Sequence, residues 1–180
     1  MKTLPDYLDR NIDILAIGLN PSPNSVRHGY PFAMTQNRFW AALNQSRLVT
    51  KDYPPGIESM QGLLRAEHIG FTDLVKRPTP GVAQLRAEDY RRWAPVLMDK
   101  IRRNHPRFLW FQGKITYAKF LRYGLERRSK GVEWGAQQEL IAGAGAFVTP
   151  NPSPANAAYS LQDITAWIDK LAVYVSRVAE

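Results

Sequence analysis

Short apolar runs that alternate with longer helical patterns constrain the fold of this chain more than any other feature. "RFLWFQ" at 107–112 is bounded by Pro106 and Gly113, and "KITYAKFLRYG" directly after it has a helical pattern. A continuous apolar run of this length predicts a strand that is buried on both faces. Strands that alternate with helices are typical of a mainly parallel sheet in a three-layer α/β/α fold.

The rest of the chain repeats this alternation. In chain order, we further expect a strand at 13–17, helices at 36–47 and 57–67, an extended piece at 69–75, a helix at 87–103, the strands "ELIAG" and "AFVTP", and a closing helix at 161–180. The chain has 180 residues and neither a repeat nor an obvious linker. We therefore expect a single domain, 1–180.

Composition excludes several classes of site. The chain has no Cys, which excludes disulfides, thiol catalysis and cysteine-based zinc sites. Its three His residues, His28, His68 and His105, lack the spacing of metal ligands. We expect a site without metal or cofactor. No run approaches the roughly 18 apolar residues of a membrane span, and the N-terminus lacks the apolar core of a signal peptide, so we expect a cytoplasmic protein.

The chain is strongly basic, with a formal net charge of +8. Such a charge is typical of a protein that contacts a polyanion, although many basic proteins are simply soluble. Lys and Arg recur in short clusters at 91–93, 100–107 and 125–130 rather than in a long basic tail. Phosphates would therefore be contacted by a folded surface.

Two loops rich in Asn, Pro and Ser follow predicted strands. "GLNPSPNSVRHGYPF" starts at the end of the first strand, and "TPNPSPANAAYS" follows the last. If these strands are parallel neighbours, both loops emerge at the same edge of the sheet, where α/β proteins bind their ligands. We expect the two loops to face one cleft.

The order of the motifs resembles a known family. "GLNPSP", "GYPFAMTQNRFW", "FTDLVKRPT", "GK" after a buried strand, "EWG" and "NPSPAN" follow one another as in the mismatch-specific uracil-DNA glycosylases and thymine-DNA glycosylases of the uracil-DNA glycosylase superfamily. The resemblance spans the chain from about residue 12 to about residue 175. It implies a monofunctional DNA repair enzyme that flips a uracil-like base out of DNA and hydrolyses its N-glycosidic bond, leaving an abasic site.

The resemblance also implies roles for residues of the first loop. Asn20 matches the residue that positions the attacking water, and Phe32 matches the aromatic residue that stacks on the base. Tyr30 could shape the mouth of the pocket, and backbone N–H groups around Ser22 and Ser25 are candidate donors to the base carbonyls. The structural alternatives are a core plug for "YPF" and a simple turn at Asn20.

Asp73 receives no role from the resemblance, because members of the family vary at this position. An Asp beyond the end of a buried strand could act as a general base on the water. Alternatively, it could cap the backbone of the turn that follows. If it is the base, loss of Asn20 should reduce activity less than loss of Asp73.

The second loop departs from the family pattern. Where relatives follow "NPS" with Gly, a bulky Leu wedge, Ser and Arg, this chain has Pro154, Ala155, Asn156 and Ala157. Ala155 is too small to fill the gap that a flipped base leaves in the stack. We expect weaker dependence on the opposing guanine and activity on single-stranded DNA, with Tyr159 as a candidate substitute wedge.

Several residues next to the matched motifs are expected to contact DNA, giving a salt-dependent affinity. They are Arg38, Lys76, Arg77, Lys114, Asn151, Ser153, Ala155 and Asn156. We expect a bacterial monomer whose partner is damaged DNA and which is associated with the nucleoid. Two alternatives remain open: a glycosylase for hypoxanthine or another deaminated base, and an inactive DNA-binding relative.

Overall fold

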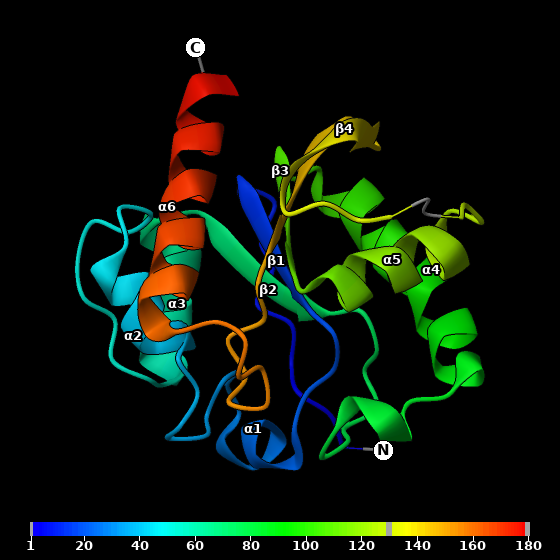
Figure 1. Cartoon of the computed structure of the whole chain (residues 1–180), viewed down its shortest axis with the longest axis horizontal. Coiled ribbons are helices and arrows are strands. Elements are labelled where there is room, and N and C mark those ends of the chain that lie inside the picture. Colours follow the sequence, from blue (N-terminus) through cyan, green and yellow to red (C-terminus); the bar gives the residue numbers. More distant parts are fainter. Residues whose placement is uncertain (1, 129–130, 179–180) are drawn as a thin grey trace.

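Five strands form one central sheet in this computed structural model, which describes residues 2–128 and 131–178 (Figure 1). In chain order they are β1 (Ile14–Gly18), β2 (Ile69–Asp73), β3 (Phe108–Gln112), β4 (Gly135–Ile141) and β5 (Ala144–Thr149). The spatial order is β2-β1-β3-β5-β4, and only β4, at one edge, runs antiparallel to its neighbour. The predicted mainly parallel sheet is confirmed.

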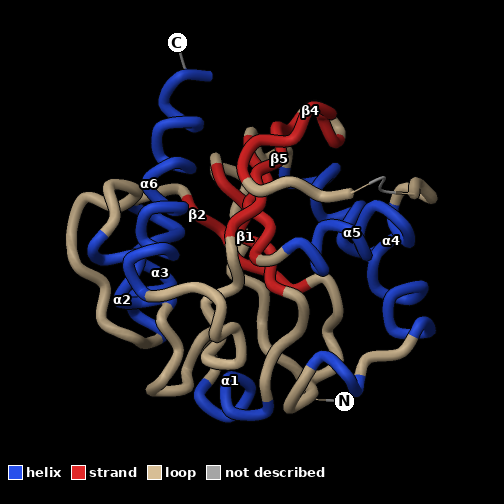
Figure 2. Tube along the Cα trace, viewed as in Figure 1, coloured by secondary structure: helices blue, strands red, loops and turns tan. Residues whose placement is uncertain are grey.

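Helices cover both faces of the sheet (Figure 2). The elements outside the sheet are α1 (Pro23–His28), α2 (Phe39–Gln45), α3 (Ile57–Ala66), the 3-10 helix η1 (Val82–Gln84), α4 (Ala87–Asn104), α5 (Lys114–Gly124) and α6 (Leu161–Val178). Helices α2, α3 and α6 pack on one face and α4 and α5 on the other. The three-layer α/β/α architecture is therefore confirmed.

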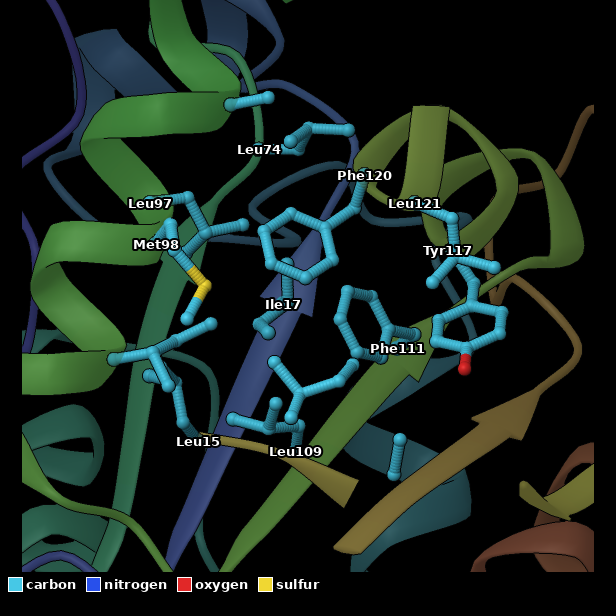
Figure 3. Close-up of a cluster of buried hydrophobic side chains, with 14 of the residues drawn as sticks. Leu15, Ile17, Leu74, Leu97, Met98, Leu109, Phe111, Tyr117, Phe120 and Leu121 are labelled. Atoms are coloured by element: carbon cyan, nitrogen blue, oxygen red, sulfur yellow. The ribbon is translucent and has the colours of Figure 1, made fainter. Parts of the chain in front are cut away.

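Strand alternation explains why the apolar runs are continuous. Successive side chains of a strand point to opposite faces, so a strand covered on both sides needs apolar residues at every position. In β1, Leu15 and Ile17 pack beneath α4 and α5, as Figure 3 shows, whereas Ile14 and Ala16 pack beneath the helices of the other layer. The sheet thus forms a rigid platform between two cores.

Several elements differ from the sequence-based expectation. The helix expected at 36–47 is shorter (α2) and the extended piece expected at 69–75 ends at Asp73, while two other differences are larger. Residues 23–28, expected as loop, form α1 because Ser22 caps the helix and Pro23 occupies its first position. Strand β4 begins at Gly135, earlier than predicted, because pairing with β5 orders residues whose side chains are largely exposed. Residues 129–130 of the third basic cluster and 179–180 of the closing helix lie outside the described residues. No described helix is long and apolar enough to cross a membrane.

Candidate active site

A cleft of about 200 Å³ lies at the carboxyl edge of the sheet. Residues at or just beyond the ends of β1, β2, β3 and β5 line it, and both Asn-Pro-Ser loops contribute walls, so the two loops face one cleft as expected. The strands that precede the loops, β1 and β5, are not neighbours, because β3 lies between them and is parallel to both. The predicted site residues that line it are Asn20, Ser22, Ser25, Phe32, Asp73, Asn151, Ser153 and Ala155.

Asn20 lies two residues beyond β1, and its amide has a fixed orientation. Its Nδ2 donates to Thr79 Oγ1 at 2.8 Å and to the carbonyl oxygens of Arg77 and Pro21 at 3.2 Å. All three hydrogen bonds use the amide nitrogen, so Oδ1 remains able to accept a hydrogen bond from a water. The side chain is thus anchored to the segment that follows β2.

Asp73 is the last residue of β2 and lies opposite Gly18 of β1. A Cβ on Gly18 would lie 2.6 Å from Asp73 Oδ1, so the carboxylate occupies space that only glycine leaves open. Burial raises the pKa of Asp73 to about 6, the charge of Asp6 adds to this increase, and Lys76 and Lys100 oppose it. This carboxyl group therefore titrates close to neutral pH.

The structure argues against the capping role for Asp73. In the turn that follows β2, the N–H groups of Leu74 and Val75 donate to the carbonyl oxygens of Gly18 and Leu19. Within the described chain, the Asp73 side chain accepts no hydrogen bond, and its nearest cation is Lys76 Nζ at 4.0 Å from Oδ2. The carboxylate is therefore available to the cleft.

A charged cluster lies behind Asp73. Asp6 binds Lys76 Nζ at 2.8 Å and Lys100 Nζ at 2.5 Å, and it also accepts a hydrogen bond from the Thr72 hydroxyl. Lys76 is buried, with 5% of its surface exposed. The expectation that Lys76 contacts a DNA phosphate is therefore wrong, because its ammonium group is held inside the protein by Asp6.

Phe32 and Tyr30, although close in sequence, have different surroundings. Phe32 lines the cleft and stacks on Phe39, with ring centroids 4.0 Å apart and an interplanar angle of 22°. Its backbone adopts the left-handed conformation, with φ 59°. Tyr30 instead packs edge-on against Trp40 and His28 and does not line the cleft, so its expected place at the mouth is wrong.

Ser22 and Ser25 form the start of α1. Ser22 Oγ accepts a hydrogen bond from the Ser25 N–H at 3.1 Å, and the two hydroxyl groups are also 3.1 Å apart. The Ser25 N–H is thus satisfied by the helix cap and is not a free donor, which corrects one of the expected roles. Both residues line the cleft.

Arg38 binds the second loop instead of presenting its charge to solvent. Its guanidinium donates to the carbonyl oxygens of Pro152, Ser153, Asn156 and Tyr159. A planar group with five N–H donors suits this arrangement. The expected phosphate contact is corrected, because the donors of Arg38 are used within the protein.

Hydrogen bonds within the second loop give it a defined shape. Asn151 Oδ1 accepts from the Ser153 N–H, Ser153 Oγ accepts from the Ala155 N–H, and Asn156 Nδ2 donates to the Asn151 carbonyl. Ala155 is exposed at the rim of the cleft, whereas Asn156 does not line it. Tyr159 packs against Trp134, so the structure argues against its use as a wedge.

The remaining two predicted phosphate contacts lie away from the cleft. Arg77 pairs with both carboxylate oxygens of Asp89 at 2.7 Å and is only partly exposed, so its charge is largely neutralised. Lys114 lies over the Trp134 ring and within 4.0 Å of Glu133, with about a third of its side chain exposed. The Arg77 and Lys114 side chains have similar exposure, 34% and 36%, but Lys114 has the looser ion pair, 4.0 Å against 2.7 Å.

Sequence reasoning missed Gln112, the last residue of β3. The residue is 1% exposed and lines the cleft as well as a smaller cavity beside it, together with Asp73 and Phe32. A polar residue at the end of an apolar strand, just before Gly113, is the signal that could have identified it. No group of three His, Cys, Asp or Glu side chains that could hold a metal occurs among the residues described.

Comparison with known proteins agrees with this arrangement of fold and site. The sequence model of the Uracil DNA glycosylase superfamily matches residues 5–172. The chain belongs to this superfamily.

Two relatives illustrate the similarity. The G/U mismatch-specific uracil DNA glycosylase of Schizosaccharomyces pombe is 30% identical over 172 residues, which cover 89% of this chain and 50% of the yeast protein. The chain thus spans about half the length of this curated relative. A candidate uracil DNA glycosylase from Methanosarcina acetivorans, solved by solution NMR, has the same fold, with a TM-score of 0.62, 19% identity and coverage of 97% of this chain and 98% of that one.

Proposed function

We propose that this protein is a monofunctional DNA glycosylase that flips uracil out of a G:U mismatch, or uracil in related contexts, and hydrolyses its N-glycosidic bond. The observation that carries this proposal is the convergence of Asn20, Phe32 and Asp73 on one cleft at the carboxyl edge of the sheet. The family membership of the chain supports the same reaction class.

Asn20 and Asp73 would share the activation of water. Cleavage of the bond places positive charge on the sugar and negative charge on the departing base. The free Oδ1 of Asn20 would orient the water, because its Nδ2 is fixed by Thr79. Asp73, with a pKa of about 6, would accept the proton of the water at neutral pH, where it is mostly ionised but still a stronger base than an ordinary Asp.

Phe32 would replace the stacking that the base loses when it leaves the duplex. Its ring is supported from behind by Phe39, so it would hold a fixed position against the flipped base. The absence of lysine from the described cleft lining supports a monofunctional reaction, because a Schiff-base step would need an amine.

The second loop would face the DNA. Asn151, Ser153 and Ala155 line the cleft, and Lys114 offers the least constrained charge for a phosphate. Ala155 projects only a methyl group, so we propose weak dependence on the opposing guanine and activity on single-stranded DNA. We further propose that the protein acts as a monomer, in the cytoplasm, on DNA of the nucleoid.

Purified protein without added metal tests this proposal. Labelled duplexes would carry uracil opposite guanine or adenine, thymine opposite guanine, or hypoxanthine, with single-stranded uracil DNA as a fifth substrate. Wild type, Asn20→Ala and Asp73→Ala are compared by alkali-cleavable abasic sites. We expect uracil release that is lost more completely in Asp73→Ala than in Asn20→Ala.

The outcomes separate the alternatives. Greater loss in Asn20→Ala would assign water activation mainly to the amide. A preference for hypoxanthine would redefine the substrate, and no release from any substrate would leave a DNA-binding relative without this activity.

A further inference from the structure

Gln112 carries a buried amide whose hydrogen-bonding groups have no partner. Both Nε2 and Oε1 are fully buried, and neither has a hydrogen-bond partner among the described residues. The backbone of the same residue is well bonded, since its carbonyl accepts from the Thr116 hydroxyl at 3.1 Å. Buried polar side chains are nearly always paired, so an amide that lacks all its partners within the protein needs a partner from outside the chain, either a water or a ligand.

The residue that carries the unpaired amide lines the cleft in which the proposed function places the base. Gln112 lines the 200 Å³ cleft and also a narrower cavity of about 10 Å³ that it shares with Phe32, Asp73 and Gly18. The other unpaired buried side-chain atom in the described chain, Trp40 Nε1, lines neither of these spaces. The position of Gln112 therefore sets its amide apart from a packing defect in the core.

We propose that Gln112 reads the flipped base by pairing its amide with a lactam edge, in which a ring N–H lies next to a carbonyl oxygen. The side-chain oxygen accepts the ring N–H, and the side-chain NH₂ donates to the base oxygen, which gives two parallel hydrogen bonds. Uracil and hypoxanthine share this edge. The inference rests on the proposed function, because it assumes that the cleft receives a base.

Such pairing makes Gln112 a determinant of base specificity. A site built around buried hydrogen-bonding groups strongly rejects an analogue that leaves those groups unpaired. Methylation of the uracil ring nitrogen removes its N–H donor and blocks this edge. Wild-type protein should therefore release uracil much faster than 3-methyluracil.

The test uses Gln112→Met, which keeps the length of the side chain and removes both polar groups. Gln138→Met, at an exposed position on β4, is the matched control. Single-turnover release of uracil and of 3-methyluracil opposite guanine is measured for each protein, together with the melting temperature. We expect Gln112→Met to lose uracil release by about 10-fold to 100-fold and to lose the discrimination against 3-methyluracil.

The same substitution should raise the melting temperature by about 2 to 4 °C, because it removes unsatisfied groups from the interior. A purely structural glutamine would give the opposite result, with a lower melting temperature and equal losses for both bases. Unchanged discrimination in Gln112→Met would overturn the inference, and would indicate that the amide binds only a trapped water.

A titration with free uracil separates this inference from the proposed function. The side-chain NH₂ resonances of Gln112 are identified by their absence from the Gln112→Met NMR spectrum. We expect them to shift when uracil is added to wild type. If these resonances shift while no base is released from DNA, the proposed reaction fails and the recognition role stands. Base release without a shift would overturn the recognition role and leave the reaction intact.

Discussion

Asp6→Asn should shift the pH dependence of base release to lower pH. Asp6 binds Lys76 and Lys100, and this pairing keeps Lys76 Nζ 4.0 Å from Asp73 Oδ2 instead of in direct contact. The substitution removes a negative charge that raises the pKa of Asp73. It also frees Lys76 to pair with Asp73. Both changes favour the ionised carboxylate.

The structure sets the size of this shift. The pKa of Asp73 is raised from 3.8 to about 6, which corresponds to about 3 kcal/mol against ionisation. Lys76 Nζ already lies 4.0 Å from Asp73 Oδ2, so the gain is the difference between this distance and a direct contact. At an effective dielectric constant of about 20, shortening the pair to about 2.8 Å contributes about 2 kcal/mol. Together with the removal of the Asp6 charge, a lysine released from Asp6 can therefore offset much of the effect of burial, and the pKa of Asp73 should fall from about 6 toward its ordinary value.

Single-turnover rates of uracil release between about pH 4 and about pH 8 measure this change. The wild-type rate should rise through about pH 6, where Asp73 ionises. In Asp6→Asn the rise should occur nearer pH 4, with a lower plateau because the carboxylate is a weaker base. Asp9→Asn, an exposed change in the same segment, is the control and should match wild type.

Lys100→Met provides the opposite perturbation, because Lys100 lowers the pKa of Asp73. The midpoint of its pH–rate profile should lie at a higher pH than the midpoint of the wild type. The two variants together would refute the reasoning if both profiles stayed at the wild-type midpoint while circular dichroism showed folded protein. This pair of variants also controls for loss of stability in Asp6→Asn, which leaves the buried Lys76 and the partly buried Lys100 without the carboxylate of Asp6.

Three further outcomes follow from the site. The raised pKa of Asp73 makes the folded state bind more protons than the unfolded state between pH 3.8 and about pH 6, so the free energy of unfolding falls as pH rises through this window. Urea unfolding should therefore show Asp73→Asn to be about 3 kcal/mol more stable than wild type at pH 7 but not at pH 3. Gly18→Ala should lose about 1 to 3 kcal/mol of unfolding free energy and at least about 10-fold in the rate of base release, because its Cβ meets Asp73. Gly56→Ala, which has open space around it and lies outside the cleft lining, should lose neither. Arg38→Lys should lower the melting temperature and weaken DNA binding, because Arg38 contacts loop carbonyls that a lysine cannot bind in the same way. The salt dependence of the DNA affinity, measured by fluorescence anisotropy, should not change, and a reduced salt slope would contradict this assignment.

The layers of the fold could be predicted because each strand buried on both faces leaves a continuous apolar run. "RFLWFQ" is such a strand, and β3 matches it closely. Helix α1 was missed because Pro21, Pro23 and Asn24 are typical of a loop, although Ser22 followed by Pro23 is also a helix-start signal. The early part of β4 has mostly exposed side chains, so its order depends on pairing with β5 and leaves no apolar pattern.

Residues at strand ends could be placed from sequence, but long basic side chains could not. Asp73 ends β2 and Asn20 lies two residues beyond β1, so topology brings them to one edge. Lys76 was expected at the surface because its partner Asp6 is 70 residues away in the chain. Arg38 was misplaced for the same reason, since it binds carbonyls more than 110 residues away. Sequence patterns report local periodicity and do not reveal such distant pairs.

Arg38 couples the two Asn-Pro-Ser loops, so that the two loops have to change together. Its guanidinium binds four carbonyls of the second loop, and its neighbour in the chain, Phe39, supports the Phe32 ring of the first loop. An insertion or deletion within 152–159 would therefore disturb the support of the base-stacking ring as well as the surface that faces DNA. A chimera that exchanges the second loop between relatives should stay active only when the first loop is exchanged together with it.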